Sequence, residues 1–277
     1  MRGRRGILRA LAPVVRGGRG VGAASPAASE PSKRGLTRGR PTARSGAMHI
    51  GLIGGIGPAA TAFYYQRIVQ LFAAASTPLS LTIVHTDIGK LAANVKTNNR
   101  LAQAQEYRRV TEQLAAAGAD KVAITSFGGS FCADEFEKIS PLPMMDGPTA
   151  MAEHLREAGL QRVGILGITP VMSSKLYGKL DGVCECLTPG DDGADAMQQV
   201  DADYRALAMA GKPTDELRSR LFAASQRLID RGAETVMLGG TDLALAFDGT
   251  EPVPVIDSAE IHVQAIVKEA LEASGAS

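Results

Sequence analysis

Ala123-Ile124-Thr125-Ser126-Phe127-Gly128-Gly129-Ser130 is an apolar run that ends in a glycine-rich turn. A second stretch of the same kind, Met237-Leu238-Gly239-Gly240-Thr241-Asp242, follows later in the chain and aligns Ser126 with Gly240. The six residues before each stretch also match, at 117–122 and 231–236. Two further pairs match in the same order, 50–54 with 163–167 and 141–146 with 252–257. Three matched strands in one order predict a duplicated α/β unit.

The repeat divides the 277-residue chain into two halves and a tail. We expect a first half of residues 48–146 plus 258–277, a second half of residues 147–257, and a disordered basic tail over residues 1–47. Apolar runs alternate with helical patterns, which predicts two pseudo-symmetric three-layer α/β halves with mostly parallel sheets. Ligands of parallel sheets bind at the carboxyl ends of the strands, so the site is expected in the cleft between the halves.

Charge is distributed unevenly along the chain. Residues 1–47 contain eleven Lys or Arg and one acid, Glu30, which leaves 19 basic and 28 acidic residues in the remainder. An acidic globular part is a poor nucleic-acid binder, and we expect no nucleic-acid partner. The tail has apolar residues at helical spacing among arginines, as in an organelle presequence of mitochondrial type. Alternatively, Met48 is the true start and the protein is cytoplasmic.

Other residue types exclude several classes of protein. Three cysteines in a chain of this length indicate a reducing compartment and no disulfide framework. The four histidines form no H-x-x-x-H pair, so we expect no metal site. The longest apolar runs fall short of the roughly 18 residues that a membrane span needs, so we expect no membrane partner.

The expected secondary structure follows from periodicity and turn residues. Thr214 is expected to cap a helix. Strands are expected at 49–54, 79–86, 121–125, 143–145, 162–167, 183–187, 234–238 and 253–256. Helices are expected at 59–75, 101–117, 130–139, 173–180, 196–210, 214–231 and 258–273, with 151–158 linking the halves.

The turn that begins at Gly55 fits the G-x-G-x-x-A dinucleotide fingerprint over residues 55–60. That motif needs an acid about 20 residues further on, but the next acid after Gly57 is Asp87. A nucleotide cofactor is therefore not expected. The N–H groups of such a turn still bind an anion at a helix N-terminus, so Gly55 and Gly57, with the Thr61 hydroxyl, are expected to hold a substrate carboxylate.

The two aligned turns supply further candidate residues. Gly128, Gly129 and Gly240 permit tight strand-to-helix connections. Polar residues lie in both aligned turns, and the internal duplication alone does not explain why these positions are polar. We therefore expect these turns to form two walls that bind a small carboxylate-bearing substrate, with Ser126, Ser130, Thr241 and Asp242 as the polar side chains.

These features resemble the aspartate/glutamate (and hydantoin) racemase superfamily. The resemblance covers residues 48–270 and rests on the segments 50–61, 117–120, 238–242 and 257–262. It implies two pseudo-symmetric α/β halves, often in a homodimer, that work without pyridoxal phosphate or another cofactor. It also implies one cysteine from each half on opposite sides of the substrate α-carbon, one thiolate removing the α-proton and the other thiol delivering one.

This chain departs from that pattern at both cysteine positions. Ser126 stands at the first, or Thr125 if the alignment carries a one-residue gap, and Gly240 stands at the second. A serine hydroxyl without a base partner is a poor proton acceptor, and glycine has no side chain. Racemisation by two thiols therefore cannot proceed in the usual way.

Three hypotheses about function follow. The first is an amino-acid racemase (isomerase) of this family, acting at the α-carbon of a small amino or dicarboxylic acid. Its catalytic candidates are Ser126, Cys132 and His262. A helix terminus next to Cys132 would lower the pKa of its thiol. The second is a one-sided lyase or decarboxylase, similar to arylmalonate decarboxylase or the dimethylsulfoniopropionate lyases. The third is a non-catalytic binding protein. Arg100 and Lys175 are possible carboxylate counterions or solvated surface residues.

Overall fold

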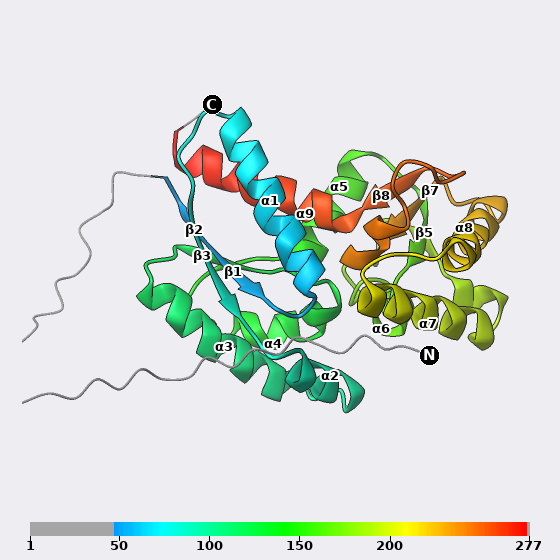
Figure 1. Ribbon diagram of the computed structural model, residues 1–277, viewed down its shortest axis with the longest axis horizontal. Coiled ribbons are helices and arrows are strands. Elements are labelled where there is room, and N and C mark those ends of the chain that lie inside the picture. The colour runs from blue at the N-terminus through cyan, green and yellow to red at the C-terminus, as the bar shows by residue number, and fades with distance from the viewer. Residues whose placement is uncertain (1–46, 276–277) are drawn as a thin grey trace, which may run out of the picture. The chain divides into compact units, whose positions relative to one another are not determined.

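The computed structural model describes residues 47–275 (Figure 1). The prediction of a disordered tail falls, except for Ala47, outside these residues. Within the described range no helix is both long and apolar enough to cross a membrane.

Two four-stranded sheets form the framework, and every strand pairing in them is parallel. The first has the order β2-β1-β3-β4, and its strands are β1 (His49–Gly54), β2 (Ser80–His85), β3 (Lys121–Ile124) and β4 (Met144–Met145). The second has the order β6-β5-β7-β8, and its strands are β5 (Arg162–Leu166), β6 (Glu185–Leu187), β7 (Thr235–Leu238) and β8 (Val255–Asp257). The identical order confirms the α/β class and the two similar halves.

Helices connect the strands (Figure 1). Before β5 they are α1 (Pro58–Ala74), α2 (Ile88–Lys96), α3 (Arg100–Ala116), α4 (Ala133–Glu137) and α5 (Gly147–Glu157), the last of which leads into the second sheet. The remainder are α6 (Thr169–Ser173), α7 (Ala194–Ala210), α8 (Asp215–Asp230) and α9 (Ser258–Ala273). Short 3-10 helices follow β3 and β7, at η1 (Gly128–Cys132) and η3 (Thr241–Leu245), and η2 (Pro189–Asp192) precedes α7.

Side-chain caps fix where several helices begin. The Thr214 hydroxyl accepts the Leu217 N–H at 3.2 Å, which confirms the predicted cap of α8. Asp146, which follows β4, and Asp257, which ends the matched strand β8, also cap their helices, α5 and α9, with a side chain. The repeat therefore extends from the strands into the helix starts.

The last helix returns to the first half. Val263, Ile266 and Ala270 of α9 lie in one buried cluster with Ile50 and Leu52 of β1. Figure 1 shows α9 beside α1, although β8 immediately before it belongs to the second sheet. The core of the first half is thus completed by the end of the chain.

Three sequence-based expectations need correction. Residues 88–96 form a helix that was not predicted, and Asp87 caps it. The helix expected at 130–139 is instead η1 followed by the short α4. The helix expected at 173–180 ends at Ser173, because residues 175–177 turn in the left-handed region with φ of 48°, 58° and 59°.

Candidate functional site

The turn after β1 presents an open helix N-terminus. Gly55 has φ +88°, a conformation that favours glycine. The Thr61 hydroxyl accepts the Gly55 N–H at 3.0 Å and donates to the Gly57 carbonyl at 3.2 Å. Gly57 offers no side-chain cap to α1, and the first turn of α1 contains no acid. Pro58, the first residue of α1, has no N–H, so the N–H groups that follow it in the first turn are the ones available to an anion, while Thr61 shapes the turn from inside.

The first wall is the turn after β3. The Ser126 hydroxyl accepts the Gly129 N–H at 3.2 Å, and the Gly129 carbonyl accepts the Tyr107 hydroxyl at 3.0 Å. A methyl group on Gly129 would lie 2.6 Å from that phenol oxygen, so only glycine fits. Among the residues described here, no histidine or carboxylate makes a hydrogen bond to Ser126. Its hydroxyl supports the turn and lacks an activating base.

The second wall is the turn after β7, and it holds a buried carboxylate. Asp242 is 6% exposed, and its Oδ2 accepts the Tyr204 hydroxyl at 3.0 Å. No Lys, Arg or His within residues 47–275 pairs with it. Burial raises the pKa of Asp242, and the hydrogen bond from Tyr204 opposes that rise.

The two halves meet at these turns. A methyl group on Gly57 would stand 3.7 Å from Asp242 Oδ2. One on Gly128 would stand 2.9 Å from the Ile168 side chain, and the Tyr177 hydroxyl donates to the Gly128 carbonyl at 3.3 Å. The structure therefore brings the anion-binding turn of the first half against the acidic turn of the second.

Cys132 lies in the core of the first half. Its side chain is 0% exposed and belongs to a cluster with Tyr107 and Phe136. Burial raises the thiol pKa to about 12, the opposite of the lowering expected from its place before α4. Desolvation outweighs the helix terminus here, so the thiol is protonated at neutral pH.

His262 is also buried, at 1% exposure, and both ring nitrogens have partners. Nε2 donates to the Met145 carbonyl at 3.0 Å, which leaves Nδ1 to accept the Tyr64 hydroxyl at 2.8 Å. Burial lowers the His262 pKa to about 4, so the ring is neutral at physiological pH. This environment suits a structural imidazole that joins α9 to α1 and β4.

The two possible counterions have different surroundings. Arg100 pairs with Glu135 at 3.0 Å. Lys175 is exposed in the left-handed turn. Neither side chain is among the contacts that join the turns after β1, β3 and β7.

Sequence reasoning missed three residues near the strand ends. Tyr204 comes from α7 and contacts Asp242, which lies 38 residues later. His85 ends β2 and packs against Gly55. Asp257 ends β8, and burial raises its pKa to about 6. Asp257 had a signal in the sequence, because it matches Asp146 in the internal repeat.

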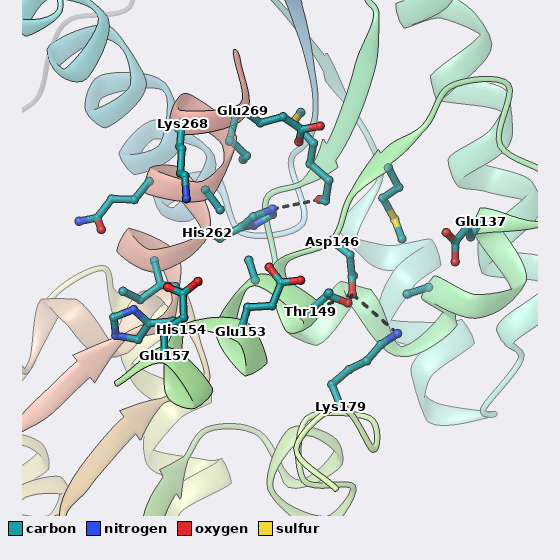
Figure 2. A pocket seen from close by; sticks show the side chains of 18 of the residues that line it. Glu137, Asp146, Thr149, Glu153, His154, Glu157, Lys179, His262, Lys268 and Glu269 are labelled. Carbon is teal, nitrogen blue, oxygen red and sulfur yellow. Dashed lines mark hydrogen bonds and ion pairs between the residues drawn. The ribbon is translucent and has the colours of Figure 1, made fainter. Parts of the chain in front are cut away.

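Two cavities stand out. The larger, about 470 Å³, lies among α4, β4, α5 and α9, and its lining includes many charged side chains, most of them acidic (Figure 2). Of the predicted site residues only His262 lines it, and Lys179 and Asp146 face each other there at 4.0 Å. The smaller, about 290 Å³, adjoins the β1 turn and includes Gly55, Thr61 and His85. Within residues 47–275 no three His, Cys, Asp or Glu side chains are grouped as a metal site would require.

The model of the Asp/Glu/hydantoin racemase family matches residues 53–266. The chain belongs to this family. A Pyrococcus horikoshii aspartate racemase homologue is 23% identical, with a TM-score of 0.65 over 80% of this chain and 98% of its own. A Yersinia pestis protein assigned provisionally to the Asp/Glu racemases is 24% identical, with a TM-score of 0.70 over 81% of this chain and 99% of its own.

A more distant structure shares the same architecture. Glutamate racemase from Francisella tularensis, solved with D-glutamate, is 14% identical, with a TM-score of 0.56 and 83% of each chain covered. At these identities the three structures establish the common fold of two α/β halves.

Proposed function

We propose that this protein is a cofactor-independent enzyme that forms and reprotonates a carbanion at the α-carbon of a small amino or dicarboxylic acid. One observation carries the proposal. The N-terminus of α1 lies next to Asp242, because a methyl group on its N-cap Gly57 would stand 3.7 Å from Asp242 Oδ2, and Asp242 is a buried carboxylate without a cation partner among the residues described here.

The anion-binding turn positions the substrate. A substrate carboxylate on the free N–H groups of α1 gains charge-assisted hydrogen bonds and the favourable end of the helix dipole. Those same groups stabilise the charge that spreads onto the carboxylate when the α-proton leaves. The α-carbon is one bond away from the carboxylate and therefore lies near the second wall.

Asp242 supplies the acid–base chemistry at that wall. A buried carboxylate with a raised pKa is a better proton acceptor than a solvated one. Perturbed carboxyl groups of this kind gather at functional sites. Ser126, Gly128 and Gly129 bound the opposite side of the substrate, and Thr241 adjoins Asp242.

The test follows α-proton exchange by proton NMR in D2O, with the full chain and pooled D- and L-amino acids and small dicarboxylic acids. The wild type should exchange an α-proton, and Asp242→Asn should lose at least about 100-fold in rate. Asp248→Asn is the matched control, because Asp248 lies on the same segment but is exposed and pairs with Arg218 at 2.8 Å. Full exchange by Asp242→Asn would refute the assignment.

A second candidate is a lyase or decarboxylase that works from one side. The unequal walls favour it, since one wall holds a serine hydroxyl and the other has glycine at the aligned position. A single acid–base group is enough for such a reaction. The same NMR experiment recognises it by new product signals without simple exchange, and saturable binding with neither would indicate a binding protein.

A further inference from the structure

The position aligned with Ser126 is filled by a tyrosine from elsewhere in the chain. Gly240 has φ −159°, an extended conformation open to any residue, so its backbone does not demand glycine. Glycine is required at this position by Tyr204 of α7, because a methyl group on Gly240 would overlap the Tyr204 ring and stand 2.9 Å from its Cζ. The Tyr204 ring occupies the space that a side chain at position 240 would need.

The same tyrosine is tied to the acid–base group of the wall. Its hydroxyl donates to Asp242 Oδ2 at 3.0 Å, and Asp242 is buried while Tyr204 is partly buried. The charged neighbours of Tyr204 on its own helix are Asp201, Asp203 and Arg205. Arg205 pairs with Asp201 at 2.6 Å, and Asp203 pairs with Arg220 at 2.6 Å. Tyr204 and Asp242 therefore form a phenol–carboxylate pair without a cation inserted between them.

We propose that Tyr204 and Asp242 form a proton relay in which the phenol oxygen of Tyr204 takes the substrate α-proton while its own proton passes to Asp242. This inference rests on the proposed function. In the forward step the substrate C–H bond breaks and a new O–H bond forms at Tyr204 Oη. The original Tyr204 O–H bond breaks, and Asp242 becomes a neutral carboxylic acid. The electron pair stays on the substrate and spreads into the carboxylate held by α1. The reverse step returns a proton to the α-carbon.

The relay avoids a charge that the site could not support. A tyrosinate beside the Asp242 carboxylate would place two anions in contact in a buried setting, and burial with that carboxylate raises the Tyr204 pKa. Tyr204 is a neutral phenol before and after the relay step. Of the two residues, Asp242 is the one whose net charge changes. The hydrogen bond between the two residues already lies along the path that the proton takes.

Tyr204→Phe tests the relay with little disturbance of shape, because the ring still fills the space over Gly240. It should lower α-proton exchange by about 10²- to 10⁴-fold while the affinity for substrate changes by only a few-fold. Tyr64→Phe is the matched control, since it also removes a buried phenol hydroxyl that bonds a titratable side chain, at His262 Nδ1, outside the turns after β1, β3 and β7. Circular dichroism confirms that each variant is folded.

A second readout does not depend on turnover. Carbon-13 NMR of the Asp242 carboxyl across a pH titration should show a higher Asp242 pKa in Tyr204→Phe than in the wild type, and no comparable change in Tyr64→Phe. An active wild type with an equally active Tyr204→Phe would overturn the relay and leave the proposed function standing. A wild type that exchanges no α-proton would overturn both. Identical Asp242 titrations in wild type and Tyr204→Phe would overturn the coupling itself.

Discussion

Asp257 should destabilise the folded protein at neutral pH, and Asp257→Asn should reveal by how much. The carboxyl caps α9 by accepting the Ala259 N–H at 2.9 Å, yet burial raises its pKa to about 6. Asparagine caps a helix as well as aspartate does. The substitution therefore removes the buried charge and keeps the cap.

The sign and size follow from linkage. The folded pKa of about 6 exceeds the ordinary aspartate value of 3.8, so the folded state holds this proton more tightly than the unfolded chain does. The resulting stabilisation is complete below the unfolded pKa and is lost as pH rises through about 6. Between pH 4.5 and 7.5 this single group should cost the wild type about 2 kcal/mol of unfolding free energy that Asp257→Asn does not lose.

Urea unfolding at pH 4.5 and at pH 7.5 gives the four free energies needed. Other titrating groups, including His262, are common to both proteins, so their contributions cancel in the double difference. Asp257→Ser is a second neutral cap and should behave like Asp257→Asn. Asp257→Ala should lose about 1 kcal/mol more at both pH values, because it lacks a cap. A double difference near zero would mean that Asp257 is not desolvated as described.

Further predictions concern stability and reactivity. Tyr64→Phe should cost about 1–3 kcal/mol in urea unfolding, since it leaves the buried Nδ1 of His262 without a donor, and an unchanged midpoint would argue against that bond. Lys175→Gly should raise the unfolding free energy by up to about 1 kcal/mol, because φ of 48° is costly for lysine but not for glycine; a loss of stability would count against this. Iodoacetamide should label the partly exposed Cys184, whose pKa is lowered by a hydrogen bond from Cys186, before Cys132, as mass spectrometry of the native protein can show. Early labelling of Cys132 would contradict its burial.

The internal repeat was enough to predict the fold. Strands buried on both faces, such as β1, are nearly continuous apolar runs and can be recognised without periodicity. The missed helix α2 spans only 9 residues, which is shorter than the stretch over which helical periodicity can be recognised. The left-handed turn at 175–177 could not be predicted, because it depends on the burial of Leu176 and the contact of Tyr177 with Gly128.

The site residues in the turns that follow strands could be predicted from the sequence. Properties and contacts that depend on tertiary packing could not. The turns after β1 and β7 contain Gly55, Gly57 and Asp242. The sequence therefore indicated that these residues lie at the carboxyl ends of their strands. Cys132 and His262 were chosen by residue type, and their pKa values depend on burial that only packing reveals. Tyr204 reaches its turn from another helix, and the one hint of it was the missing side chain at Gly240.

The return of α9 to the first half has a consequence for synthesis on the ribosome. The second half is an insertion in the first, and the cluster around β1 gains Val263, Ile266 and Ala270 only when α9 is made. A nascent chain that has emerged as far as β8 still exposes the apolar face that α9 will cover. The second half has all its strands by then and can fold first. The folding order should therefore run against the order of translation, because the core of the first half stays incomplete until α9 is made.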